Sequence, residues 1–179
     1  MSVANIPFIQ EEALLYIKEI IKKNKIKLIL EIGTATGYSA MEMALVDELI
    51  KVITIEKDEE RYLEAIKNVK KNNLEKRIKL ILGDAKEIEL KQKFDLIFID
   101  AAKSSNLVFF EKFKNNLTKN GLIITDNINF SLAKKNNSKR VLRMLKKIEL
   151  YRQFLIENKD FETTFIDLGD GLSISKKRC

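Results

Sequence analysis

The residues with the clearest chemical potential lie in a ten-residue stretch, EIGTATGYSA, at positions 31–40. Glu31 precedes Gly33, and Gly37 follows four positions later. Glycines let a backbone pass close to a bound group, and the fingerprint Gly-x-Gly-x-x-Gly uses them to approach a pyrophosphate. Here the middle glycine is absent, and the Glu31 carboxylate would repel a phosphate. The stretch therefore predicts a ligand that carries positive charge and no phosphate.

S-adenosylmethionine has these properties, because it joins an ammonium group and a sulfonium to a nucleoside. Glu31 is placed to pair with the ammonium, directly or through water. Glu56 ends the next apolar run and can accept hydrogen bonds from both ribose hydroxyls. Gly83, Asp84 and Ala85 end a third run, where the adenine would lie. The alternative is that these acids are ordinary strand-end residues, which the combination of motifs disfavours.

Two further apolar runs end in oxygen-bearing side chains. Asp100 follows DLIFI, and Asp126 and Asn127 follow LIIT. Neighbouring carboxylates repel one another, and a divalent cation would relieve that repulsion; ligands that are all oxygen favour Mg²⁺, with Mn²⁺ or Ca²⁺ also possible. Lys103 is three residues beyond Asp100 and can reach a substrate at the same place. A turn and a helix cap are the alternative roles for these residues.

These residues are positioned by an alternation of strands and helices. The apolar runs predict strands at 26–33, 51–56, 78–85, 94–100 and 121–127, and a final hairpin at 161–168 and 172–177. Amphipathic periodicity predicts helices at 11–24, 37–49, 58–72, 106–117 and 138–158. In the helix at 58–72, we expect Tyr62, Ile66 and Val69 to form the apolar stripe.

Such alternation is typical of a parallel sheet covered by helices on both faces. Ligands bind such sheets beyond the carboxyl ends of the strands, which is where the candidate residues fall. We therefore expect an α/β fold: one domain over 1–179 with a doubly wound, mostly parallel, seven-stranded sheet and an antiparallel C-terminal hairpin.

Composition excludes several classes of protein. The chain of 179 residues has 45% hydrophobic residues, no histidine and a single cysteine, Cys179. Histidine-based triads, typical zinc sites and an internal disulfide are therefore excluded. Neither a signal peptide nor an apolar run long enough to span a bilayer is evident. We expect a cytoplasmic protein that does not bind membranes.

Positive charge is concentrated in one segment. Between Lys134 and Arg152 there are eight Lys or Arg residues and one acid, Glu149, an excess equal to the net charge of +7 of the whole chain. A local basic segment suits a polyanionic partner. The alternative is a solvated helix face in a Lys-rich protein.

Taken together, EIGTATGYSA, Glu56, GDA, DLIFIDAAK and ITDN resemble the motifs of the cation-dependent, catechol-type O-methyltransferases. That family uses S-adenosylmethionine on a Rossmann-like fold, and the resemblance runs from about Ile6 to the C-terminus. It implies that Asp100, Asp126 and Asn127 hold Mg²⁺ or Mn²⁺, and that Lys103, together with Asp100, is catalytic. The implied cofactor-binding residues are Glu31, Gly33, Thr34, Gly37, Ser39, Glu56, Gly83, Asp84, Ala85 and Asp100.

The C-terminal part looks more specifically like the bacterial branch that methylates 5-hydroxyuridine at the tRNA wobble position. This resemblance implies a tRNA anticodon loop as partner, and we expect a homodimer, because homodimers are common among similar proteins. The residues expected to bind RNA are Lys139, Arg140, Arg143, Lys146 and Lys147. Two alternatives remain: a methyltransferase for catechol-like small molecules, and a cofactor-binding protein without catalysis. A nicotinamide dehydrogenase is disfavoured because Glu31 opposes a pyrophosphate.

Overall fold

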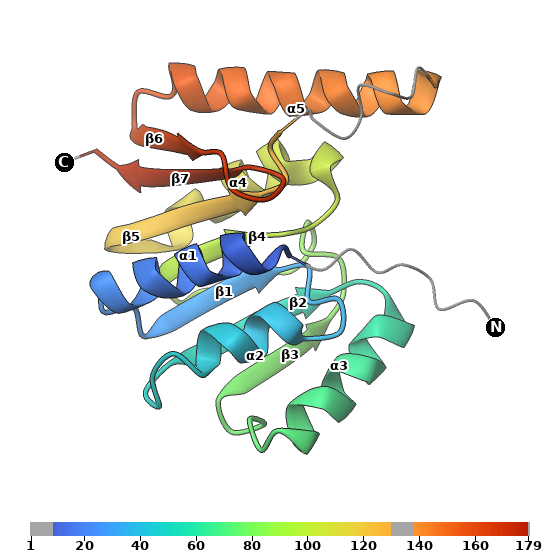
Figure 1. Ribbon diagram of the computed structural model, residues 1–179, viewed down its shortest axis with the longest axis vertical. Helices are drawn as coiled ribbons and strands as arrows, with labels where there is room; N and C mark the ends of the chain where they lie inside the picture. Colours follow the sequence, from blue (N-terminus) through green and yellow to red (C-terminus); the bar gives the residue numbers. More distant parts are fainter. Residues whose placement is uncertain (1–8, 130–137, 179) are drawn as a thin grey trace.

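The computed structural model describes residues 9–129 and 138–178, which form a seven-stranded sheet flanked by helices (Figure 1). The strand order is β3-β2-β1-β4-β5-β7-β6. The strands are β1 Leu28–Ile32, β2 Lys51–Glu56, β3 Ile78–Leu82, β4 Phe94–Ile99, β5 Leu117–Asp126, β6 Phe161–Ile166 and β7 Leu172–Lys177. The helices are α1 Glu11–Lys23, α2 Tyr38–Ala44, α3 Glu59–Lys71, α4 Asn106–Phe113 and α5 Lys139–Glu157, with short 3₁₀ turns η1 Lys103–Ser105 and η2 Lys114–Asn116.

The sheet is parallel from β1 to β5 and ends in an antiparallel pair. β1 pairs in parallel with β2 and β4, and β4 with β5. β7 then runs antiparallel to both β5 and β6. The predicted doubly wound α/β fold with a C-terminal hairpin is therefore confirmed.

Each face of the sheet carries its own hydrophobic core, because successive strand residues point to opposite faces. In β1, Ile29 joins the core beneath α1, α2 and α3, whereas Leu30 and Ile32 join the core beneath α4 and α5. Figure 1 shows α1, α2 and α3 together on the near side of the sheet. All three of these strand residues are at most 1% exposed. The near-continuous apolar strand read from the sequence is thus explained by burial on both faces.

Some element boundaries differ from the prediction. β5 begins at Leu117, because the polar segment at 118–120 that resembles a turn continues the strand, with an irregular register opposite Phe94 and Leu96. α2 ends at Ala44, earlier than expected. In α3 the expected stripe was wrong at one position, since Ala65 is fully buried and Ile66 is 37% exposed.

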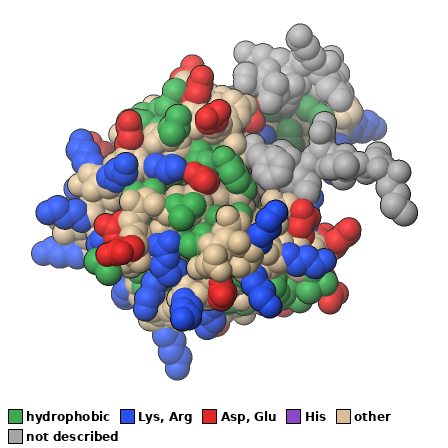
Figure 2. All heavy atoms as spheres, turned by 60° about the horizontal axis from the view of Figure 1, so that its bottom comes forward, with side chains coloured by type: hydrophobic (Ala, Val, Ile, Leu, Met, Phe, Trp, Pro, Cys, Tyr) green, Lys and Arg blue, Asp and Glu red, His purple; other side chains and the backbone are tan. Residues whose placement is uncertain are grey.

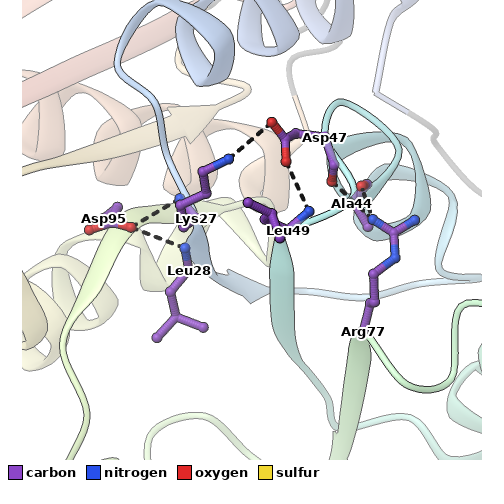
Figure 3. A network of polar contacts seen from close by, with 7 residues as sticks. All are labelled: Lys27, Leu28, Ala44, Asp47, Leu49, Arg77 and Asp95. Atoms are coloured by element: carbon purple, nitrogen blue, oxygen red, sulfur yellow. Dashed lines mark hydrogen bonds and ion pairs between the residues drawn. The ribbon is translucent and has the colours of Figure 1, made fainter.

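A polar network holds the strands together at the amino edge of the sheet, the edge where the parallel strands begin (Figure 3). Asp95 Oδ2 accepts hydrogen bonds from the backbone N–H groups of Lys27 and Leu28, both at 3.0 Å, and so ties β4 to β1. Lys27 Nζ lies 3.0 Å from Asp47 Oδ2. Arg77 donates to the carbonyls of Ala44 and Asp47 at 2.7 and 3.0 Å. Both acids of this network, Asp95 and Asp47, therefore accept hydrogen bonds from backbone N–H groups.

Surface charge is mixed over much of the molecule. Figure 2 brings the lower part of Figure 1 forward and shows Lys and Arg side chains spread over that face, with Asp and Glu side chains among them. Among the described residues, no helix is both long and apolar enough to cross a membrane.

Candidate active site

A cavity of about 500 Å³ lies at the carboxyl edge of the sheet, opposite the amino-edge network. Its volume is in the range that small-molecule sites usually occupy. Most of the residues predicted to bind the cofactor or a metal, or to be catalytic, line it: Gly33, Glu56, Gly83, Asp84, Ala85, Asp100, Lys103, Asp126 and Asn127. The structure therefore brings together side chains from strand ends that are up to about 95 residues apart in the sequence.

The loop after β1 needs glycine at its first position for a reason the sequence did not reveal. Gly33 has φ +100°, and a Cβ at this position would lie 2.2 Å from the carbonyl oxygen of Asp100. The Gly33 backbone is held by a hydrogen bond from its N–H to the Ile55 carbonyl at 3.0 Å. Only a residue without a side chain lets the loops after β1 and β4 approach this closely.

Glu31 is buried beneath this loop and is 0% exposed. Thr54 Oγ1 donates to Glu31 Oε2 at 2.6 Å, and the Ser39 hydroxyl donates to Glu31 Oε1. Burial raises the pKa of the Glu31 carboxyl to about 8, although these two hydroxyls act to lower it and the charges of Asp100 and Glu56 raise it further. A carboxylate kept this far from water is poised to gain from a nearby ammonium group.

The other residues expected in the first loop are also buried. Like Glu31, the residues Thr34, Gly37 and Ser39 are buried and do not line the cavity, and Thr34 and Ser39 are 1% and 7% exposed. The hydroxyls of Thr34 and Thr54 lie 2.6 Å apart and extend the chain of hydrogen bonds to Glu31. In this arrangement Ser39 and Thr54 orient Glu31, and Thr34 acts through Thr54. The direct contact of Thr34 and Ser39 with a cofactor stays a prediction.

Glu56 is the last residue of β2 and lies in the cavity wall. Its Oε2 accepts from the Ala35 N–H at 2.8 Å, and its Oε1 accepts from the Asp58 N–H at 2.9 Å. Each carboxylate oxygen retains a free lone pair after one hydrogen bond. Glu56 is thus fixed in orientation and can still accept two hydroxyl donors.

The loop after β3 also lines the cavity, next to the end of β2. Gly83 donates its N–H to the Glu56 carbonyl at 2.8 Å, which aligns the ends of β2 and β3. Asp84 Oδ1 accepts from the Lys86 N–H at 2.9 Å and shapes the turn that follows. Ala85 is 5% exposed and packs in the core beneath the cavity.

Two carboxylates and an amide meet where β4 and β5 end. Asn127 Nδ2 donates to Asp100 Oδ1 at 3.1 Å, and the Asn127 N–H donates to Asp126 Oδ1 at 2.7 Å. Asn127 has φ +63°, a left-handed conformation that asparagine tolerates better than most residues. Asp100, Asp126 and Asn127 are thus brought together at one corner of the cavity, and their role as metal ligands stays a prediction.

The protonation of these carboxyls reflects their surroundings. Burial, followed by the Asp126 charge, raises the pKa of Asp100 to about 7, while Lys103 and Asn127 lower it. Burial raises the pKa of Asp126 to about 6; the Asn127 N–H lowers it and the charge of Asp170 raises it. The cluster is thus short of positive charge, and its all-oxygen donor set fits a hard divalent cation.

Several cavity residues were not among the predicted site residues. Gln10 lies at the start of α1, and Asp170 lies in the turn between β6 and β7. Lys57, Arg61 and Lys86 follow β2 and β3 and also line the cavity. Their one sequence signal was proximity to a strand end, and for Asp170 it was the pair of glycines that flank it.

The helix α5 packs beside this cavity, against η1, the turn that contains Lys103. Arg152 reaches the loop after β5, with its guanidinium 3.4 Å from the Ile128 carbonyl and 4.5 Å from the centre of the Phe165 ring. The basic residues predicted to bind RNA are all exposed on the N-terminal half of α5: Lys139, Arg140, Arg143, Lys146 and Lys147. Lys134 and Lys135, which belong to the same basic segment of the sequence, lie outside the described residues.

Comparison with known proteins identifies the class. Residues 3–178 match the O-methyltransferase family, so the chain belongs to it. The predicted enzyme class, an S-adenosylmethionine-dependent O-methyltransferase, is thereby confirmed.

Individual relatives agree with this assignment. A Staphylococcus aureus structure, provisionally named a caffeoyl-CoA O-methyltransferase, superposes with a TM-score of 0.93 at 37% identity, over 98% of this chain and 88% of its own. An O-methyltransferase from Bacillus cereus in complex with SAH gives a TM-score of 0.83 at 25% identity, over 98% of this chain and 86% of its own. The caffeoyl-CoA O-methyltransferase of Populus kitakamiensis is 28% identical over 177 residues, which are 92% of this chain and 75% of that protein.

Proposed function

We propose that this protein methylates a hydroxyl that has a second oxygen beside it, with the help of a divalent cation, and that the acceptor is 5-hydroxyuridine at the wobble position of tRNA. One observation carries the cation-dependent part. Asp100 and Asp126 are two carboxyls of raised pKa, and they share a cavity corner with the Asn127 amide. Such a cluster gains stability from a divalent cation.

Asp100, Asp126 and Asn127 would hold the cation. When bound, it supplies a Lewis acid that lowers the pKa of an acceptor hydroxyl. Lys103 lines the same cavity, close enough to lower the pKa of Asp100. As an ammonium, Lys103 can stabilise the oxyanion that forms, and only in its neutral amine form could it accept the hydroxyl proton at Nζ.

The remaining chain positions the cofactor. Glu56 would hold the ribose hydroxyls, and Glu31, oriented by Ser39 and Thr54, would favour the ammonium group. Apolar residues such as Phe109 in the cavity wall limit water. Catalysis then depends mainly on holding the methyl donor and the acceptor in line.

The choice of an RNA acceptor rests on the charge pattern of α5. In α1 and α3 the first turn is acidic and the last turn is basic, which complements the helix dipole. α5 reverses this pattern, because its first turn has no acid while Lys139 and Arg140 lie there, and its last turn has no base. A bound polyanion would offset the unfavourable interaction with the helix dipole and would make binding depend on salt.

A small catechol-like acceptor is the second candidate. It is favoured by the similarity to caffeoyl-CoA O-methyltransferases. Both acceptors present adjacent oxygens, so the chemistry in the cavity is the same for both. They differ in that only the RNA acceptor would also bind the basic face of α5.

The test compares two triple charge reversals of the purified enzyme. The variant Arg140→Glu, Arg143→Glu, Lys147→Glu changes the exposed face of α5, and Lys22→Glu, Lys23→Glu, Lys25→Glu is the matched control at the far end of α1. The substrates are a catechol and tRNA from cells that lack this gene. The tRNA product is 5-methoxyuridine, formed by methylation of 5-hydroxyuridine, and it is measured by nucleoside mass spectrometry. We expect the α5 variant to lose tRNA methylation and retain catechol turnover, with the control unaffected. No 5-methoxyuridine from the wild type, or equal losses on both substrates, would contradict the RNA proposal.

A further inference from the structure

A third carboxylate lines the cavity from an element outside the parallel strands. Asp170 lies in the turn between β6 and β7 and shares the cavity with Asp100 and Asp126. From the sequence alone, the segment GDG at 169–171 indicated no more than a hairpin turn.

The pairing of β7 with β5 places this turn beside Asp126 and Asn127. Leu172 pairs with Asp126 across the antiparallel β5–β7 ladder. The residues just before Leu172 therefore lie beside those just after Asp126. This places Asp170 next to the Asp126–Asn127 corner of the cavity.

The turn is held on two sides, so the backbone of Asp170 is fixed in position. The Asn129 N–H donates to the Asp170 carbonyl at 2.9 Å. A Cβ on Gly171 would lie 2.3 Å from Cγ of Asn129, and one on Gly169 would lie 3.2 Å from Cβ of Gln10. Both glycines have positive φ, +56° for Gly169 and +83° for Gly171. Glycine on each side thus allows the turn to wedge between α1 and the loop after β5.

The charge of Asp170 is not balanced by an ion pair within the part of the chain that the structure describes. Among residues 9–129 and 138–178, Asp170 forms no ion pair within 4.0 Å. Of the four Lys or Arg residues that line the cavity, Lys103 is the one whose charge lowers the pKa of both Asp100 and Asp126. Three carboxylates and one ammonium leave a negative excess that a divalent cation would neutralise.

We propose that Asp170 strengthens cation binding through its charge and is not itself a ligand, since no three His, Cys, Asp or Glu side chains among the described residues are grouped closely enough to hold a metal ion. This inference rests on the proposed cation-dependent function and adds a residue to that site. Asp170 would raise the affinity for the ion without contacting the cofactor.

The experiment measures Mn²⁺ binding by isothermal titration and by electron paramagnetic resonance of free Mn²⁺, on the protein saturated with S-adenosylhomocysteine. Asp170→Asn should weaken Mn²⁺ binding about fivefold, the effect of one unit charge on a divalent ion several ångströms away. Asp170→Glu keeps the charge and should bind Mn²⁺ within about twofold of the wild type. Asp160→Asn is the matched control, because it makes the same charge change at the opposite, exposed end of β6.

The outcomes separate the two proposals. S-adenosylhomocysteine affinity should be unchanged in all variants, which shows that the fold and cofactor site are intact. Wild-type Mn²⁺ affinity in Asp170→Asn, or an equal loss in Asp160→Asn, would overturn the role of Asp170 alone. Absence of Mn²⁺ binding by the wild type would overturn the cation-dependent function as well.

Discussion

The two edges of the sheet use the same kind of residue in opposite ways. At the amino edge, Asp95 accepts two backbone N–H groups and Asp47 pairs with Lys27. A hydrogen bond from the Leu49 N–H, followed by the interaction with Lys27, holds the pKa of Asp47 below its ordinary value. At the carboxyl edge, burial raises the pKa of Asp100 to about 7 and of Asp126 to about 6.

Left-handed backbone does not separate the two edges. Ala35 and Asn127 have φ of +47° and +63° and line the cavity. However, Lys25 and Asn73 have φ of +52° and +57° in the turns that precede β1 and β3. The difference lies in the acids: those of the amino edge are paired, and those of the carboxyl edge are left for a ligand to complete.

The largest effect should come from neutralising one carboxylate at the carboxyl edge. Asp126→Asn should lower methyl transfer about 1,000-fold, as expected when an electrostatic group of the site is lost. Its unfolding temperature without ligands should equal or exceed that of the wild type, because a buried charge is removed. Kinetics and thermal unfolding of the same preparation test both statements. A less stable but active variant would contradict them.

A second prediction concerns the contact between the loops after β1 and β4. Gly33→Ala places a Cβ against the Asp100 carbonyl and should cost about 3 kcal/mol of unfolding free energy, since backbone must move. Gly37→Ala is the control, because its Cβ would lie 3.4 Å from Cβ of Ala65 and the cost is limited to the left-handed conformation, about 1 kcal/mol. Urea unfolding gives both values. Equal costs would show that the close approach is unimportant.

At the amino edge, Asp95→Ala should lower the unfolding free energy by about 2 kcal/mol, because two backbone donors lose their acceptor. S-adenosylhomocysteine affinity should stay unchanged. Asp95→Asn retains an oxygen and should lose less. A large loss of cofactor affinity in Asp95→Ala would break the functional separation of the two edges.

A further prediction concerns the pH dependence of stability, which has a defined sign. The folded-state pKa of Asp126, about 6, lies above its ordinary value of 3.8. Its contribution to stability is therefore present below about pH 4 and is lost as pH rises through about 6. The difference in unfolding free energy between the wild type and Asp126→Asn should fall by about 1 to 3 kcal/mol from pH 4 to pH 8, and added Mg²⁺ should reverse the fall.

The contribution of Asp47 to stability should depend on pH with the opposite sign. Its pKa is lowered in the folded protein, so its contribution is present above its ordinary pKa and is lost only as pH falls. The difference between the wild type and Asp47→Asn should thus be flat from pH 6 to pH 8. Chemical denaturation at several pH values measures both differences, and matching pH profiles would contradict the comparison.

The strand ends that carry the site could be predicted from the sequence, because an apolar run followed by an acid is a local signal. Asp100, Asp126 and Asn127 could be placed together since parallel strands end at one edge. Asp170 could not be placed, because its position depends on the β5–β7 register and on Gly171 packing against Asn129. The burial of Glu31 beneath its own loop likewise depends on hydroxyls from other elements, Thr54 and Ser39.

The central claim is that the incomplete edge holds a divalent cation beside the cofactor. Anomalous scattering from a crystal grown with Mn²⁺ and S-adenosylhomocysteine tests it most directly. We predict one strong peak bounded by the side chains of Asp100, Asp126 and Asn127. A crystal with the nucleoside bound and no peak at that corner, or a peak elsewhere only, would contradict the account.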